Sequence, residues 1–322
     1  MKRLVGALAL WMALGCAAAQ GADVVRLGNL KFAHYGAVSY MKEIGAKYGL
    51  DIQEKVFPKG IDIVPAIIAG EIDCAASAED GAIAARASGV PIYIVAGFAK
   101  GGARIVGRPD IKWTSLSDLK GKKVGVARGG AQELVLLAEL TKLGLSYSDK
   151  GDKDVHIVYM AYADLNQALM AKDIDAICQS EPQSSQAMSK GYGVEIIKPY
   201  DTPIGEPLRT LIITEDMYNK HRDVAERFLK CFVEATKFFI ENPDAARRYV
   251  EEKMFKNQLS DEDYTQAIEN SPFTYDVTVE HIQTTTDQMM KYGIGKMTNP
   301  PKALDFVKTD LLEKAKLELE AK

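Results

Sequence analysis

The stretch AIIAGEIDCAA, residues 66–76, returns later in the chain in a close copy, ALMAKDIDAIC, residues 168–178. In both copies an apolar segment with helical spacing leads into an acidic turn and then into a short strand that begins with Ile-Asp. Short apolar runs bounded by turn residues are typical of strands buried in a sheet. This repeated segment, called the repeated phrase below, therefore predicts two structural units with the same order of helices and strands.

The sequence around each copy alternates short apolar runs with helix-like segments. This alternation predicts two mostly parallel sheets that are flanked by helices, an α/β fold. In the first unit the predicted strands are 24–30, 51–56, 72–76 and 92–96, and the predicted helices are 37–49, 61–69 and 82–88. In the second unit the predicted strands are 123–127, 155–159 and 174–178, and the predicted helices are 131–143 and 165–172.

Two strand-like links, RIVGR at 104–108 and RTLIIT at 209–214, lead out of the first and second units. Beyond the second link the pattern is mostly helical. Residues 223–240 are amphipathic, and the Asn-Pro pair at 242–243 predicts a new helix with asparagine as its cap. A final helix is expected from about Lys302 to the end of the chain.

The beginning of the chain has the pattern of a signal peptide, residues 1–19. Two basic residues precede the apolar run 4–14, which is too short to span a bilayer, and small residues lead to a predicted cleavage after Ala19. Cys16 leaves a second possibility open, because Leu-Gly-Cys resembles the end of a bacterial lipobox. Both alternatives predict a periplasmic location.

Composition limits the classes of function. With 322 residues, 47% of them hydrophobic and 26% charged, the chain fits one large or two medium globular domains. Its formal net charge of −4 provides no basic field, so nucleic acid is not expected as a partner. Cys74, Cys178 and Cys231 are predicted to be buried thiols, although one disulfide stays open. No cofactor and no metal site are expected.

Several segments, in this order, resemble one known family. They are AGEID at 69–73, SLSDLKGKKVGV at 115–126, the Ser-Glu-Pro turn at 180–182 and the Asn-Pro pair at 242–243. The chain is similar to the periplasmic substrate-binding proteins of ABC importers, in particular the nitrate/sulfonate/taurine and pyrimidine-precursor (NMT1/THI5-like) family.

The resemblance implies two lobes joined by a two-stranded hinge, with the ligand held between them. The expected division is 23–108 for the first part of lobe 1, 109–208 for lobe 2, and 209–322 for the return to lobe 1 with C-terminal helices. In open parallel sheets, ligands bind beyond the carboxyl ends of the strands. Each copy of the repeated phrase would then supply one strand that ends at the cleft.

That geometry selects the candidate ligand-binding residues on lobe 1. Aromatic rings could pack on a ligand, cations could pair with an anion, and a hydroxyl could donate and accept. A core position for the aromatics, capping by Ser77 and a solvated lysine stay open as alternatives. The candidates are Lys31, Phe32, His34, Tyr35, Ser77, Phe98 and Lys100.

On lobe 2 the strongest candidate is Arg128, followed by Gly129 and Gly130 at a helix start. Glycine amides can approach a polar ligand closely, and an arginine can bind a carboxylate or sulfonate in bidentate fashion. The alternative is that Arg128 pairs with a neighbouring acid. Tyr162 is a further candidate, with Asp164 as the expected helix cap, and the resemblance adds Glu181, which could bind a ligand amine or the hinge.

The expected function is capture of a small organic molecule and its delivery to the membrane permease of an ABC importer, by a monomer. Cations beside a helix start favour an organic anion such as a sulfonate or carboxylate, and a nitrogen heterocycle stays open. The competing classes are an enzyme on the same scaffold and a receptor that presents its ligand to a sensor protein. Against an enzyme, the sequence has no nucleophile elbow, no His-Glu-x-x-His helix and no Walker-type phosphate loop.

Overall fold

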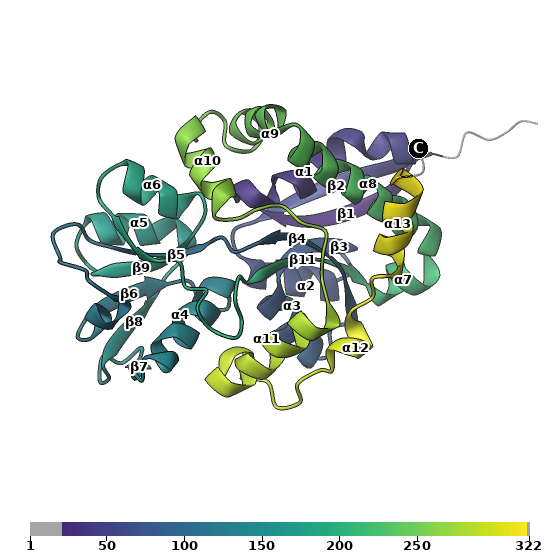
Figure 1. The fold of residues 1–322 in the computed structure, drawn as a ribbon. Helices are drawn as coiled ribbons and strands as arrows, with labels where there is room; N and C mark the ends of the chain where they lie inside the picture. Colours follow the sequence, from purple (N-terminus) through teal and green to yellow (C-terminus); the bar gives the residue numbers. More distant parts are fainter. Residues whose placement is uncertain (1–20, 321–322) are drawn as a thin grey trace, which may run out of the picture.

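The computed structural model describes residues 21–320, so the predicted signal peptide, its cleavage site and Cys16 lie outside the described residues. Figure 1 shows two sheets that lie side by side, each with helices on its faces. This is the two-unit α/β architecture that the repeated phrase predicts. Among residues 21–320, no helix has the length and apolar character needed to cross a bilayer.

The first sheet has five strands in the order β2-β1-β3-β11-β4. Strand β1 pairs in parallel with β2 and β3, whereas β11 is antiparallel to both of its neighbours. Its strands are β1 (Asp23–Leu30), β2 (Leu50–Phe57), β3 (Cys74–Ala78), β4 (Ile92–Lys100) and β11 (Leu208–Thr214). Its connecting helices are α1 (Gly36–Ile44), α2 (Ile63–Ile68) and α3 (Glu79–Ala87), with short 3₁₀ turns at Ala33–Tyr35, Gly45–Tyr48 and Gly60–Asp62.

The second sheet has the order β10-β5-β9-β6-β8-β7. Here β6, β8 and β9 are parallel, and β5 is the antiparallel strand. Its strands are β5 (Ala103–Gly107), β6 (Lys123–Val126), β7 (Tyr147–Ser148), β8 (Val155–Tyr159), β9 (Ala176–Ser180) and β10 (Val194–Ile197). Its helices are α4 (Ala131–Lys142), α5 (Tyr162–Met170) and α6 (Gln183–Ser189), with a 3₁₀ turn at Leu116–Leu119.

The two copies of the repeated phrase occupy equivalent places in the two sheets. Each ends in a strand, β3 or β9, that lies between a parallel and an antiparallel neighbour. The Asp73 carboxylate accepts the amide of Arg26 at 2.9 Å, and the Asp175 carboxylate accepts the amide of Lys123 at 2.9 Å. Each aspartate thus holds the start of its own strand against the neighbouring strand, β1 or β6, through a hydrogen bond from a backbone amide.

The chain crosses from the first sheet to the second at Gly101 and Gly102, which both have positive φ (63° and 75°). It returns through residues 198–207, and the two crossings meet where the Gly101 amide donates to the Pro207 carbonyl at 2.9 Å. Strand β5 therefore belongs to the second sheet. The expected extension of lobe 1 to residue 108 is wrong here, because β5 finds its pairing partners in β9 and β10.

The C-terminal region is helical, as expected, and returns to the first sheet. Helix α8 packs against both α1 and α13, while α10 reaches across to α6 of the second sheet. Its helices are α7 (Glu215–Lys220), α8 (Arg222–Glu241), α9 (Pro243–Tyr249), α10 (Asp261–Glu269), α11 (Val279–Tyr292), α12 (Ala303–Phe306) and α13 (Asp310–Glu320). A π-helical turn follows α9 at Val250–Met254, and a 3₁₀ turn lies at Ile294–Lys296.

Three local predictions in the helical regions are wrong. The expected final helix is broken between α12 and α13, because Val307 bridges to Ile94 of β4. Asn242 stands at the N-cap position of α9 and Pro243 begins the helix, as predicted, but side-chain capping is wrong, because the Asn242 side chain donates to the Phe238 carbonyl instead. Asp164 is not the cap of α5 either, since that helix already begins at Tyr162.

Candidate functional site

A cavity of about 620 Å³ lies between the two sheets. The first sheet contributes the residues that follow β1 and β3, together with the segment 59–65. The second sheet contributes the residues that follow β6 and β8 and the end of β9. The cavity therefore lies at the carboxyl ends of parallel strands from both units, where ligands bind in open α/β sheets.

The loop after β1 supplies an aromatic wall. Phe32 and Tyr35 line the cavity, as predicted, and their rings lie 5.5 Å apart. His34 lies behind them, fully buried, with its ring 4.9 Å from that of Tyr35. Burial and then the positive charge of Arg209 hold the pKa of His34 well below its usual value, so it is neutral. Lys31 points elsewhere and lies over the ring of Phe255.

The residues after β3 place a hydroxyl and a carboxyl on the cavity. Ser77 lines the cavity and donates to the Ala78 carbonyl at 3.0 Å, so it does not cap α3. Asp80, in the first turn of α3, lines the cavity too. Burial raises the pKa of Asp80 to about 7, against the opposing effect of Arg209.

Arg209 is the main residue that the sequence reasoning missed. It lies on β11, only 2% exposed, and lines the cavity. Within the described chain, neither of its terminal guanidinium nitrogens has a hydrogen-bond partner. A buried charge without a partner is costly, so such a group is typically held in place to bind an anion. The available signal was a lone arginine in an apolar strand, LRTLIIT.

On the second sheet, Arg128 lines the cavity at its exposed rim. Its guanidinium stacks 3.6 Å from the ring centroid of Tyr159 and pairs with Asp149 at 3.1 Å. Arg128 therefore does pair with a neighbouring acid, which was the alternative to a role in ligand binding. The side chain is 55% exposed, so this pair contributes little to stability.

Gly129 and Gly130 also line the cavity, and each has a different structural role at the start of α4. The Gly129 amide already donates to the Glu133 carboxylate at 2.6 Å, which also accepts from Tyr159. A Cβ on Gly130 would lie 2.4 Å from the Tyr162 hydroxyl. Glycine at 130 thus makes room for Tyr162 beside the start of α4.

Tyr162 reaches the cavity from α5. Its hydroxyl donates to the Gln132 side chain at 2.8 Å, and Gln132 in turn donates to the Gly102 carbonyl at 3.1 Å. Its ring contacts that of Phe32 edge-on, with the centroids 5.4 Å apart. Phe32 and Tyr162 come from different sheets, so this contact joins the two walls of the cavity.

Three other predicted site residues do not line the cavity. Phe98 is buried in the core behind Tyr35. Lys100 is exposed at the end of β4. Both were expected in a loop after residue 96, but β4 continues to Lys100 because Ala99 and Lys100 pair with β11.

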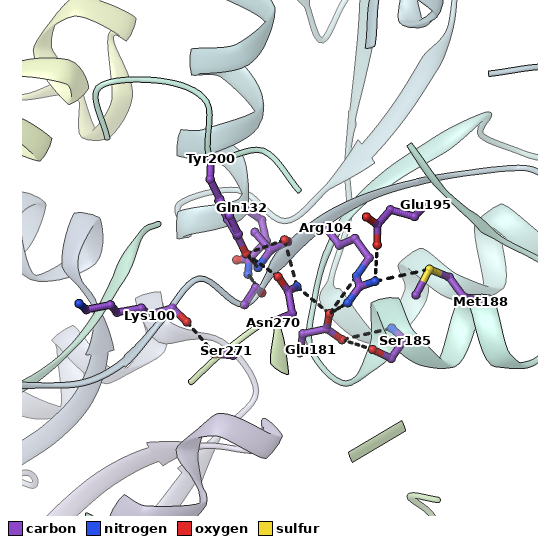
Figure 2. Close-up of polar contacts among 12 residues, drawn as sticks. Lys100, Arg104, Gln132, Glu181, Ser185, Met188, Glu195, Tyr200, Asn270 and Ser271 are labelled. Carbon is purple, nitrogen blue, oxygen red and sulfur yellow. Dashed lines mark hydrogen bonds and ion pairs between the residues drawn. The ribbon is translucent and has the colours of Figure 1, made fainter. Parts of the chain in front are cut away.

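Glu181 is the third, and it lies at the crossing between the sheets (Figure 2). Its carboxylate is fully buried and pairs with Arg104 at 3.0 Å. It also accepts from Asn270 at 2.8 Å and from the Ser185 hydroxyl at 2.7 Å. Of the two possibilities left open for Glu181, the structure shows the hinge contact, and the assignment to the ligand site is wrong.

The cysteines of the described chain form no disulfide, and no metal site is found among residues 21–320. Cys74, Cys178 and Cys231 are free and buried, as predicted. Burial raises the pKa of the Cys74 and Cys178 thiols, so they are protonated at neutral pH. Within residues 21–320, no three or more His, Cys, Asp or Glu side chains are grouped so that they could hold a metal ion.

Comparison with known structures defines the fold class. The chain matches the alkanesulfonate-binding protein from Xanthomonas axonopodis pv. citri bound to MOPS with a TM-score of 0.76 and 16% identity, over 90% of this chain and 100% of that one. It matches the periplasmic nitrate-binding protein from Synechocystis PCC 6803 with a TM-score of 0.76 and 17% identity, over 93% and 90% of the two chains. The fold is that of the periplasmic binding proteins.

The sequence comparisons identify the family. The NMT1/THI5-like family model matches residues 46–246, so the chain belongs to this family. A protein from Brachyspira hyodysenteriae, named provisionally as an ABC transporter periplasmic binding protein, is 23% identical over 290 residues. That match covers 84% of this chain and 81% of the relative.

Proposed function

We propose that this protein captures a small organic anion in the cavity between its two sheets and delivers it to the permease of an ABC importer. The family and the fold support the class of function, since the matched proteins are named as periplasmic binding proteins. The named ligands of two structural relatives, an alkanesulfonate and nitrate, are anions and support the same choice.

Arg209 is the observation that carries the proposal. Its guanidinium is buried at the cavity, and its terminal nitrogens have no hydrogen-bond partner among the described residues. An arginine binds a carboxylate or sulfonate through two parallel N–H donors. An anion that enters the cavity supplies the missing partner, and the binding is strong because the charge has already lost its water.

The two crossings supply the hinge of the proposed mechanism. Residues 101–102 and 198–207 connect the sheets, and the Phe32–Tyr162 contact closes the cavity between them. A ligand that touches both walls stabilises the closed arrangement over an open one. We therefore divide the chain into lobe 1, residues 21–100 with 208–320, and lobe 2, residues 103–197.

Export belongs to the same proposal. The basic head, the apolar run and the small residues before Gln20 predict cleavage after Ala19, and Cys16 offers lipid anchoring instead. The intact mass of protein recovered outside the cytoplasm separates the two outcomes. A chain that begins at Gln20 supports cleavage, whereas a chain that begins at an acylated Cys16 supports anchoring.

A binding screen tests the proposed function. The mature protein is unfolded, dialysed and refolded to remove any bound ligand, and its thermal stability is then measured with sulfonates, carboxylates and uncharged heterocycles. We expect acids to raise the melting temperature and heterocycles without an acid group to leave it unchanged. Catalytic turnover of any hit would contradict a role in binding alone.

The substitution Arg209→Met tests the residue that carries the proposal. We expect the affinity for the best acid to fall by about 3 kcal/mol, as for loss of a buried charged partner. The unliganded variant should be at least as stable as the wild type, because the substitution removes a buried charge whose terminal nitrogens have no hydrogen-bond partner in the described part of the chain. Calorimetry and chemical denaturation measure both quantities.

Arg128→Met is the matched control for that experiment. It removes the same charge from the exposed rim of the same cavity, where Asp149 already pairs with it. We expect a loss of affinity of about 1 kcal/mol or less. A larger loss for Arg128→Met than for Arg209→Met would overturn the assignment of the anion to Arg209.

A further inference from the structure

Asp80 gives the cavity a second buried group without a complete set of partners. It lies in the first turn of α3, is 2% exposed, and one of its carboxylate oxygens, Oδ1, lacks a hydrogen-bond partner within the described chain. Asp73 shows what a purely structural aspartate looks like here, because both of its oxygens accept hydrogen bonds from Arg26. A buried carboxyl does not help a cavity to bind a simple anion, because the ionised carboxylate repels an anionic ligand.

Asp80 and Arg209 do not satisfy each other. They influence each other electrostatically, but no ion pair within 4.0 Å and no hydrogen bond joins them in the described residues. If Asp80 existed only to neutralise Arg209, a direct bidentate pair would be the expected geometry. The two groups instead remain separate on one cavity, each with unused hydrogen-bonding capacity.

Three other polar side chains on the cavity, Ser77, Tyr162 and Gln132, have partners within the protein. The Ser77 hydroxyl donates to the Ala78 carbonyl, and the Tyr162 hydroxyl donates to Gln132. The Gln132 amide nitrogen donates to the Gly102 carbonyl. Asp80 and Arg209 are therefore buried charged side chains on the cavity that still have hydrogen-bonding atoms without a partner in the described chain. A ligand could bind to both.

Much of the remaining cavity wall is apolar. The side chains of Leu30, Phe32, Ile63, Ile212 and Ile294 line it. The volume of about 620 Å³ lies in the range of sites for drug-sized molecules, so an inorganic oxyanion would leave most of it without contacts. The cavity fits a ligand with an apolar body that carries polar groups at separate positions.

From these observations, and resting on the proposed function, we propose that the ligand is amphoteric. It carries an acid group that binds Arg209, an apolar and preferably ring-shaped body, and an N–H donor, a protonated amine in the strongest case, that binds Asp80. Arg209 then binds the acid group of the ligand. Asp80 acts as the specificity residue, because it favours binding of amino-acid-like ligands over organic acids that have no N–H donor.

Matched pairs of probes test this assignment on the wild-type protein. The amphoteric probes are 3- and 4-(aminomethyl)benzoate, and the acid-only controls are 3- and 4-ethylbenzoate, in which a methyl group replaces the ammonium at nearly the same size. Calorimetry at pH 8 gives both affinities. We expect the better amphoteric probe to bind about ten-fold more tightly than its control, which is typical of one charge-assisted pair.

The variant Asp80→Asn then tests the residue. We expect it to weaken the amphoteric probe about ten-fold and to leave the ethylbenzoates within about three-fold or to tighten them, since a repelling charge is lost. Its melting temperature without ligand shows whether the fold is intact. The wild-type comparison keeps the proposal testable even if this variant fails to fold.

The outcomes separate this inference from the proposed function. If the ethylbenzoates bind as tightly as the amphoteric probes, or if Asp80→Asn weakens both equally, the amphoteric ligand is refuted while the anion site stands. If no acid in the screen or among these probes binds, the anion site of the proposed function fails, and the amphoteric assignment fails with it.

Discussion

At the scale of single residues, Asp80 makes the stability of the unliganded protein depend on pH. Its pKa is about 7 in the folded protein, raised by burial, and about 3.9 in an unfolded chain. The folded state therefore binds the proton more tightly. The resulting contribution to stability is fully present below about pH 4 and is lost as the pH rises through 7.

The comparison of wild type with Asp80→Asn isolates this effect. Chemical denaturation at pH 5 and pH 8 should show that the wild type loses on the order of 2 kcal/mol more than the variant over this interval. Other groups that titrate, such as His34 and His281, are common to both proteins and cancel in the difference. The charged groups nearest Asp80 are Arg209, Glu79 and Glu133. An equal pH dependence in both proteins would show that Asp80 is not protonated in this way.

The residues that sequence reasoning placed correctly on the cavity share a simple rule. Phe32, Tyr35, Ser77 and Tyr162 lie just beyond the carboxyl ends of predicted strands, and topology brings such positions together. Arg209 lies inside a strand instead, so the same rule passes over it. Its place on the cavity depends on the return of the chain from the second sheet into β11. Such a tertiary arrangement cannot be read from local sequence patterns.

At the scale of elements, the crossing from β4 to β5 depends on glycine. Gly101 has φ of 63°, and a Cβ there would lie 2.5 Å from the Asn270 carbonyl oxygen. Gly144 has φ of 70° but nothing within 4 Å of its Cβ position. We expect Gly144→Ala to cost about 1 kcal/mol for the left-handed backbone alone, and Gly101→Ala to cost about 3 kcal/mol.

Urea unfolding of both alanine variants measures the two costs. Because the left-handed conformation is common to both sites, the difference between the variants reports the contact with the C-terminal segment at Asn270. Equal losses of stability would mean that the segment moves away freely. The crossing would then be looser than the structure shows.

The Glu181 network is the second element-scale feature with a direct test. Glu181→Gln removes the charge that pairs with the buried Arg104 and that accepts from Asn270 and Ser185. We expect a loss of stability of about 2 kcal/mol, because the buried pair loses one charge while Arg104 keeps its second partner, Glu195. The affinity for ligand should stay unchanged in the folded variant. A selective loss of affinity with intact stability would return Glu181 to the ligand site.

At the scale of the whole molecule, repetition in the sequence predicted the architecture well. The phrases at 66–76 and 168–178 do mark equivalent strands, and the resemblance to one family agrees with the family match. The division near residue 108 could not be read from local patterns. β5 is an ordinary apolar strand, and its membership in the second sheet depends only on pairing with β9 and β10.

The molecule therefore combines two similar sheets, two crossings and a cavity between the sheets, where the terminal nitrogens of the buried Arg209 have no hydrogen-bond partner among residues 21–320. We propose that an anion binds between the sheets at Arg209. A crystal structure of the protein with its tightest-binding acid would show which arginine the acid group contacts. We expect an acid oxygen within about 3 Å of the terminal nitrogens of Arg209, with Phe32 and Tyr162 enclosing the ligand from opposite walls. An acid bound only at the rim, on Arg128, with Arg209 still unpaired, would contradict this proposal.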